Sequence, residues 1–154
     1  MKKILKGIAL ALAAILLLIQ FVRPLRDNPP VVGSETLEAA VEVPADVNAI
    51  IKRSCADCHS NETQYPWYSN VAPFSWLLAD HIDDGRKELN FSKWNTYDAR
   101  KRAHKLEEIC EMVNSSSMPL PSYLWIHSDA ALSADDSKKL CDWATAERAK
   151  LQGS

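Results

Sequence analysis

The segment Cys55-Ala56-Asp57-Cys58-His59 brings two thiols and an imidazole together within five residues. This C-x-x-C-H spacing is typical of covalent haem attachment. Two thiols three residues apart at a helix end can each form a thioether with a haem vinyl group, and the next residue then presents its imidazole to the iron from the same side. The pattern predicts one covalent haem c, attached through Cys55 and Cys58, with His59 as the proximal iron ligand.

Three other uses of this pentapeptide fit the rest of the chain less well. A thioredoxin-like dithiol follows a strand in a βαβ unit, which the sequence does not indicate. A structural zinc site needs a second pair of ligands, and the remaining cysteines, Cys110 and Cys141, are too far apart in the sequence to form one. A disulfide between Cys55 and Cys58 would be strained.

A sixth iron ligand is expected from the segment that follows the third predicted helix. Met118 comes after the polar run 114–117, in a loop where its thioether can reach the open face of a haem. Thioether ligation favours ferrous iron and raises the reduction potential. His81 and His127 are alternative ligands, and an open or water-bound position is a further one. His104 lies in a basic stretch and is expected to be solvated.

Cys110 and Cys141 each lie on the apolar stripe of a predicted helix. Outside the cytoplasm, two such cysteines are expected to form a disulfide. The bond would close a loop of about 30 residues and contribute roughly 3 to 4 kcal/mol by the chain-entropy argument. The alternative is a pair of buried free thiols.

The N-terminus is typical of an export element. Residues Gly7–Val22 carry no charge and are followed by Arg23 and Pro24. As a helix this run spans roughly 24 Å, which long basic side chains at its ends extend to the two membrane interfaces. We predict an uncleaved transmembrane anchor over residues 1–26, because the residues after the apolar run form a poor cleavage site. The alternative is a signal peptide that is removed. The basic flank stays in the cytoplasm, which places the rest of the chain outside.

Charge is divided unevenly along the chain. The whole sequence of 154 residues has a formal charge of −2, but residues 1–26 hold five basic and no acidic side chains, so the remainder carries −7. An acidic surface repels nucleic-acid phosphates, so no nucleic-acid partner is expected. It favours a redox partner with a basic docking surface.

The remaining chain is expected to form a linker over residues 27–43 and a haem-binding domain over residues 44–154. Residues 27–43 have few aromatic side chains and no helical period. The domain shows four helical patterns. The first follows Pro44, and the second follows Pro73 with an apolar stripe that includes Phe74 and Leu77. The third has Thr96 as its cap, and the fourth has Ser133 as its cap with Asp136 three residues on. Only 123–126 resembles a strand, so the fold class is all-α, a bundle of about four helices with long loops around one haem.

Several further stretches strengthen the haem interpretation through a resemblance. The residues after His59, the run Tyr65-Pro-Trp-Tyr-Ser-Asn-Val-Ala-Pro, the stretch Gly85–Trp94 and the run Met118-Pro-Leu-Pro resemble the haem-binding domain family of bacterial c-type cytochromes. The resemblance covers about residues 44–145 and implies one covalent haem c. The order of motifs is also similar to class I cytochrome c, which implies Met118 as the distal ligand.

These observations together predict a membrane-anchored monohaem cytochrome that carries single electrons outside the bacterial cytoplasmic membrane. An electron carrier is favoured over an enzyme because no distal acid and base pair occurs at a recognisable spacing. The alternative is a haem-based sensor or a peroxidase-like enzyme with an open or exchangeable sixth iron position.

Overall fold

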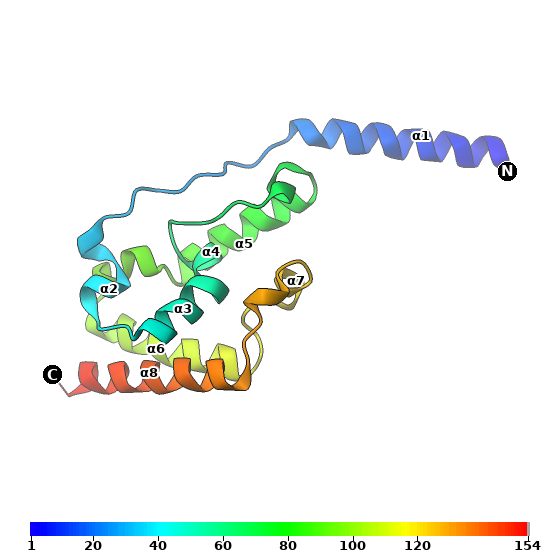
Figure 1. The fold of residues 1–154 in the computed structure, drawn as a ribbon. Coiled ribbons are helices and arrows are strands. Elements are labelled where there is room, and N and C mark those ends of the chain that lie inside the picture. The colour runs from blue at the N-terminus through cyan, green and yellow to red at the C-terminus, as the bar shows by residue number, and fades with distance from the viewer. Residues whose placement is uncertain (154) are drawn as a thin grey trace.

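The computed structural model describes residues 1–153, which form helices joined by turns and irregular segments (Figure 1). No β-strand occurs in this range, so the predicted all-α class is confirmed. The α-helices are α1 (Lys2–Leu18), α2 (Leu37–Ala40), α3 (Ala45–Ser54), α4 (Ala56–His59), α5 (Phe74–Glu88), α6 (Ala99–Asn114), α7 (Pro121–Leu124) and α8 (Ala134–Gln152). The short 3-10 helices are η1 (Ile19–Phe21), η2 (Gly33–Glu35), η3 (Trp67–Asn70), η4 (Phe91–Thr96) and η5 (Ser128–Ala130).

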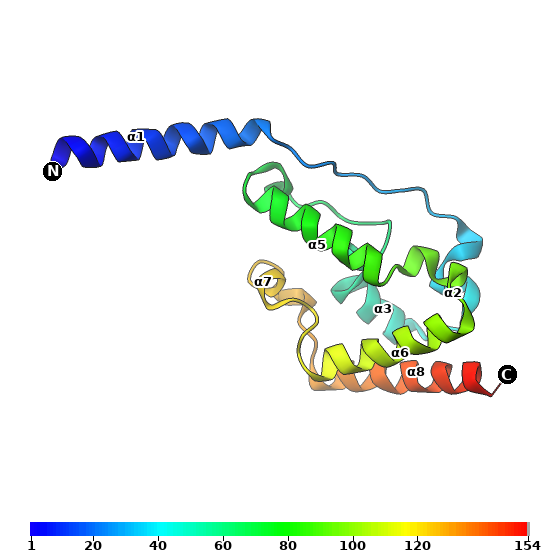
Figure 2. The same cartoon turned by 180° about the vertical axis from the view of Figure 1, so that it is seen from behind.

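Helix α1 projects away from the rest of the chain, as Figures 1 and 2 show from opposite sides. Together with η1 it forms a segment of 20 residues, Lys2–Phe21, with a mean hydropathy of 2.4 and no buried part. At about 1.5 Å per residue its length is roughly 30 Å, the thickness of the hydrocarbon core of a bilayer. The segment is therefore long and apolar enough to cross a membrane.

The main core lies where α6 and α8 run antiparallel side by side and α3 packs against α8. Each helix contributes one apolar stripe, because residues three and four apart share a face. The buried side chains of this core are Leu37, Val47, Ile50, Ile51, Leu89, Phe91, Trp94, Leu106, Val113, Leu140, Trp143 and Ala144. A disulfide between Cys110 and Cys141 joins α6 to α8, with an S–S distance of 1.98 Å.

Helix α6 begins at a different cap from the predicted one. The carboxylate of Asp98 accepts the backbone N–H of Lys101 at 2.7 Å and so caps the helix. Thr96, the cap indicated by the sequence, instead ends η4, where its hydroxyl donates to the carbonyl of Lys93 at 2.6 Å. The prediction for Thr96 is wrong because threonine and aspartate both cap helices, and the turn of η4 decides which of them reaches the first free N–H.

Helix α8 begins with the predicted capping pair. The hydroxyl of Ser133 accepts the N–H of Asp136, and the carboxylate of Asp136 accepts the N–H of Ser133, each at 3.0 Å. Arg53 also donates to this carboxylate at 3.0 Å, which connects the end of α3 to the start of α8. The bonds from Ser133, followed by the charge of Arg53, hold the pKa of Asp136 below its usual value.

Residues 27–43, the predicted linker, lie against the domain in the structure. Leu37 in α2 is only 1% exposed and belongs to the main core. The carbonyl of Asp27 and the side-chain oxygen of Asn28 accept hydrogen bonds from Arg86 at 2.8 and 2.7 Å. Ala40, Val41 and Val43 also pack against this core, and polar groups make the other contacts. The domain is therefore held close to the end of α1 along this path.

A smaller core forms where α5 packs against η3. Its buried side chains are Tyr68, Leu78 and Ile82. The sequence pattern places Phe74 and Leu77 on the same stripe of α5, but these side chains are 54% and 51% exposed. Periodicity identifies the apolar face of a helix, whereas the neighbouring chain decides how much of that face is covered.

The segment that resembles a strand in the sequence is helical or irregular. Residues Pro121–Leu124 form α7, and Pro121 suits the first helical position because its missing N–H would have no partner there. The N–H groups of Leu124 and His127 donate to the carbonyls of Leu120 and Tyr123 at 3.2 and 3.1 Å. This short helical path brings the residues that follow Met118 back toward α4.

Candidate functional site

The pentapeptide Cys55–His59 lies at a junction between two helices. Helix α3 ends at Ser54, and α4 begins at Ala56 and ends at His59. The buried stripe of α3 fixes this junction against the main core. Cys55 and Cys58 are both free, and burial raises their pKa values to about 12 and about 11. The structure therefore holds two uncharged, reduced thiols one helical turn apart.

The imidazole of His59 is oriented by the end of α5. Its Nδ1 atom lies 2.9 Å from the carbonyl oxygen of Gly85 and 3.0 Å from that of Leu89, and both oxygens can only accept. Nδ1 therefore carries the hydrogen, which leaves the lone pair of neutral histidine on Nε2. Burial lowers the pKa of His59, so the neutral form dominates although the two carbonyl contacts favour protonation. A neutral imidazole with a fixed tautomer is the form that binds iron.

Gly85 allows α5 to approach α4 closely enough for these contacts. A Cβ atom at this position would lie 2.6 Å from the carbonyl oxygen of Cys58, which is backbone and cannot swing aside. The same residue supplies one of the two carbonyls that accept from His59. A residue without a side chain is therefore required beside the C-x-x-C-H helix.

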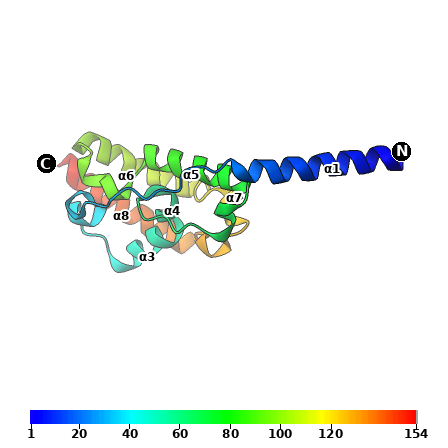
Figure 3. The same cartoon turned by 90° about the horizontal axis from the view of Figure 1, so that it is seen from above.

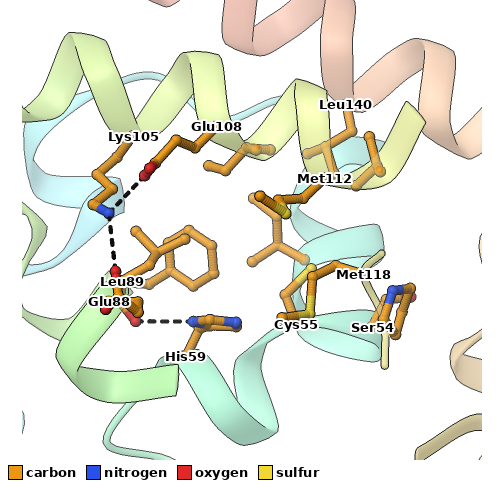
Figure 4. Close-up of a pocket in the computed structure, with 15 residues that line it drawn as sticks. Ser54, Cys55, His59, Glu88, Leu89, Lys105, Glu108, Met112, Met118 and Leu140 are labelled. Carbon is orange, nitrogen blue, oxygen red and sulfur yellow. Dashed lines mark hydrogen bonds and ion pairs between the residues drawn. The ribbon is translucent and has the colours of Figure 1, made fainter. Parts of the chain in front are cut away.

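A largely apolar cavity of about 200 Å³ opens between α4 and α6 (Figure 4). The figure shows the side chains of His59, Cys55 and Met118 around the same space, with Lys105 and Glu108 on α6 at its opposite edge. The residues that line it are Ile51, Ser54, Cys55, His59, Glu88, Leu89, Phe91, Lys105, Glu108, Ile109, Met112, Val113, Met118, Pro119 and Leu140. Such a cavity suits a large, flat, mainly apolar ligand.

A second cavity, of about 320 Å³, lies next to the first and is bordered by α5 and α7. The two cavities share six residues: Ser54, Cys55, His59, Glu88, Met118 and Pro119. Cys58 and His81 line only the second cavity. The structure thus brings four predicted residues, Cys55, Cys58, His59 and Met118, to one connected region.

Met118 reaches this region because its loop folds back on the end of α6. The N–H groups of Ser117 and Met118 both donate to the carbonyl of Met112, at 3.0 and 3.2 Å. Ser116 makes the reversal with a positive φ of 56°. The loop therefore presents Met118 to both cavities.

The other predicted iron ligands occupy different places. His81 on α5 borders the second cavity together with Met118. His127 lies outside both cavities, where its Nε2 atom is 2.7 Å from the hydroxyl of Tyr68 and its ring stacks on Tyr123 at 4.2 Å between centroids. His104 is exposed, as expected, and lies 3.3 Å from Glu108. Of the alternative histidines, only His81 shares a cavity with His59.

Two residues of the cavity wall do not stand out in the sequence. Met112 is a second methionine beside the first cavity, and Lys105 is buried there at 8% exposure. The amine of Lys105 lies 2.6 Å from Glu108 and 3.6 Å from Glu88. Their spacing in the sequence could have indicated them, because residues 105, 109 and 112 lie on one face of a helix.

Asp57, between the two cysteines, connects the pentapeptide to the chain around it. Its carboxylate accepts the hydroxyl of Tyr123 and the N–H of Gln64, each at 2.9 Å, and its carbonyl accepts the hydroxyl of Thr63 at 2.6 Å. Burial, followed by the bond to Asp57, raises the pKa of Tyr123. The pentapeptide is therefore held in place by its own polar residue as well as by α3.

Comparison with known proteins gives one match. A family model described as a haem-binding domain matches residues 14–146, which include every residue of the site and both cysteines of the disulfide. No curated protein matches the chain, and no solved structure does.

Proposed function

This chain belongs to the haem-binding domain family, and from that premise we propose that it is a membrane-anchored monohaem c-type cytochrome domain that transfers single electrons. The observation that carries the proposal is that Cys55, His59 and Met118 line the same two cavities. The residues fit a haem, because the cavity walls are mainly apolar and the neutral imidazole keeps its Nε2 lone pair free for iron.

Cys55 and Cys58 would attach the cofactor. Each thiol would add its S–H bond across a vinyl group, so that a C–S bond forms and the hydrogen moves to the neighbouring carbon. The addition needs no oxidant, and it requires the two cysteines to be free, as they are. The double attachment would hold a cofactor that a domain of this size cannot enclose by itself.

His59 and Met118 would be the ligands of the iron. Gly85 and Leu89 orient the imidazole, and the loop contact to Met112 positions the thioether. When bound, haem supplies reversible one-electron chemistry at its iron. Thioether ligation would raise its reduction potential. Lys105 lines the first cavity, and its amine, which pairs with Glu108 and Glu88, would also suit a haem propionate.

The anchor and the charge complete the proposal. Helix α1 would span the bacterial cytoplasmic membrane with its basic N-terminus inside, which places the haem domain in the periplasm or another space outside this membrane. The charge of −7 beyond residue 26 favours a redox partner with a basic docking surface, and association that slows as salt rises.

Expression together with a haem c maturation system tests the covalent attachment. We expect the purified chain to keep its haem after denaturation and to gain the mass of one haem. His59→Ala should lose the low-spin spectrum, while Cys55→Ala combined with Cys58→Ala should release the cofactor on denaturation. A colourless chain, or a chain whose haem is extracted by acidic solvent, would contradict the proposal.

Comparison of Met118→Ala with Met112→Ala tests the sixth ligand, because both methionines border the first cavity. We expect only Met118→Ala to lose the sulfur-to-iron charge-transfer band, to lower the potential and to bind carbon monoxide rapidly. Rapid binding by the unchanged protein would instead support a sensor or peroxidase-like function. Retention of the band in Met118→Ala would show that another residue is the ligand.

A further inference from the structure

Exposed apolar side chains gather at one end of the domain. Among the described residues beyond residue 26, ten large apolar side chains are exposed, and seven of them lie in or just after η3, in the first turn of α5 or just after α7. We call these seven the apolar end face: Trp67, Val71, Phe74, Trp76, Leu77, Trp125 and Ile126. Trp67 and Trp125 are 77% and 85% exposed, which is costly in water for side chains of this size.

The two parts of the end face come from distant segments but lie together. The hydroxyl of Tyr68, next to Trp67, is 2.7 Å from Nε2 of His127, which follows Ile126. The rings of Tyr68 and His127 also meet edge to face, with centroids 5.9 Å apart. This contact connects η3 to the chain after α7, so the apolar side chains on both segments belong to one surface.

This surface lies beside the end of α1. The N–H of Ala72 donates to the side chain of Gln20 at 2.9 Å, and Gln20 donates to the carbonyl of Ala72 at 3.0 Å. The indole N–H of Trp76 donates to the carbonyl of Val22 at 2.7 Å. All three views show η3, the start of α5 and α7 at the end of the domain nearest to α1, with α1 pointing away from it (Figures 1, 2 and 3).

The charge pattern is that of a membrane interface. Helix α5 is apolar in its first turn, at Phe74 and Leu77, and becomes acidic at Asp80, Asp83 and Asp84, further from α1. The side chain of Arg26 bonds to Ser69 and Asn70 at the edge of the end face. Tryptophan is enriched where a protein meets lipid headgroups, and the long side chain of an arginine beside a membrane segment can reach them.

We propose that the apolar end face rests in the interfacial layer of the same bilayer that α1 crosses. The inference rests on the proposed anchor, and it adds a second membrane contact made by the haem domain itself. The membrane-spanning segment ends at Phe21, so the membrane boundary lies near Gln20 and Val22, which contact Ala72 and Trp76. A lipid surface is therefore the partner that fits the apolar end face. The packed residues 27–43 keep the domain at that level.

Photolabelling of the full chain tests this contact. The protein is reconstituted in phosphatidylcholine vesicles that contain a phosphatidylcholine with a diazirine near the start of one acyl chain. After irradiation, peptides are analysed by mass spectrometry. We expect adducts on α1 and on the peptides that carry Trp67–Leu77 and Trp125–Ile126, at about fivefold the yield on the peptide of Val31 and Val32, which are exposed apolar residues away from this face.

A pair of matched variants gives the control. Trp67→Gln combined with Trp125→Gln should reduce labelling at Phe74 and Leu77 about threefold, because tryptophan contributes most to interfacial binding. Val31→Gln combined with Val32→Gln should leave it unchanged. Both pairs alter exposed side chains, so neither should prevent folding.

Each outcome decides the proposal. Adducts on α1 without adducts on the end face would overturn it and leave the anchor standing, whereas the absence of adducts on α1 would overturn both. Equal labelling of the end face and of Val31 and Val32 would also overturn it. A dimeric mass of the protein in detergent, with no lipid adducts on the end face, would assign the surface to a contact between two copies instead.

Discussion

The half of the domain around α3, α6 and α8 buries twelve apolar side chains in one cluster, whereas the half around α4, α5 and η3 buries three. Polar contacts replace apolar ones in the second half. Arg86 alone donates to the carbonyl of Ser60 and to the hydroxyl of Thr63 at 2.8 and 2.9 Å. The buried amide of Asn90 donates to Asn61 at 2.9 Å. Hydrogen bonds of this kind position a chain well but add little net stability.

The two cavities lie between these halves, and their walls come from both. Leu140 of α8 and Ile109 of α6 face the first cavity from the apolar half, while Leu78 and His81 of α5 face the second from the polar half. A ligand that binds only the folded chain stabilises it in proportion to its affinity. The apolar half therefore has a large core of its own. We expect the polar half to gain more stability from a bound cofactor.

The largest expected effect is on the apolar half. Trp94 is fully buried in the main core, so Trp94→Ala should lower the free energy of unfolding by about 3 to 5 kcal/mol. Chemical denaturation of the purified chain measures this change. Trp67→Ala, which removes an exposed ring, is the matched control and should change it by less than about 0.5 kcal/mol. Equal effects would show that burial in the main core does not determine stability.

Loss of the disulfide should be nearly as large. Cys110 and Cys141 are 31 residues apart, and Cys110→Ala combined with Cys141→Ala should cost about 3 to 4 kcal/mol because the unfolded chain gains freedom. The free energy of unfolding with and without a reductant measures the same quantity in the unchanged protein. A variant as stable as the parent would show that the packing of α6 on α8 needs no cross-link.

A smaller effect should appear at the boundary of the two halves. Gly85→Ala places a Cβ atom against the backbone of Cys58 and should cost about 1 to 3 kcal/mol through overpacking. It should also disturb the haem spectrum, because Gly85 orients His59. Gly33→Ala is the control, since its added Cβ would lie within 4 Å of no atom beyond Gly33 and the two adjacent residues. Identical behaviour of the two variants would contradict the close packing of α5 on α4.

The smallest expected effect is at the start of α8. Ser133→Ala removes a helix cap and should cost about 1 kcal/mol.

Since the pKa of Asp136 is lowered by folding, the contribution of its carboxylate to stability is present above the usual pKa of 3.8 and is lost as the pH falls through the lower folded value. The unfolding free energies of the parent and of Asp136→Asn in urea should therefore differ more at pH 7 than at a pH below 3.8. A constant difference at both pH values would contradict this assignment.

Sequence reasoning succeeded where a feature depends on near neighbours. The capping pair of Ser133 and Asp136 is three residues apart, and the buried stripe of α3 spans one short helix. It was wrong for the cap at Thr96, where the competing Asp98 lies only two residues away. It could not show that Leu37 enters the main core, because α2 has only four residues and is too short for a clear period.

The site divides in the same way. The spacing of the pentapeptide alone predicts its chemistry. The packing of α6, and no local pattern, places Met112 and Lys105 beside the first cavity. Phe74 and Leu77 lie on a predicted buried stripe and are exposed because no other segment covers the start of α5. Periodicity therefore identifies the apolar face of a helix, whereas the tertiary structure decides which segment covers that face.

The amino-acid sequence by itself determined the C-x-x-C-H pentapeptide, the long apolar N-terminal segment and the all-helical class, because each depends on residues a few positions apart. The tertiary structure alone decided which distant groups surround His59. The carbonyls that orient its ring come from Gly85 and Leu89, and Met118, rather than His127, shares its cavities. These choices depend on how helices pack across 26 to 59 residues of chain, and no local pattern encodes that packing.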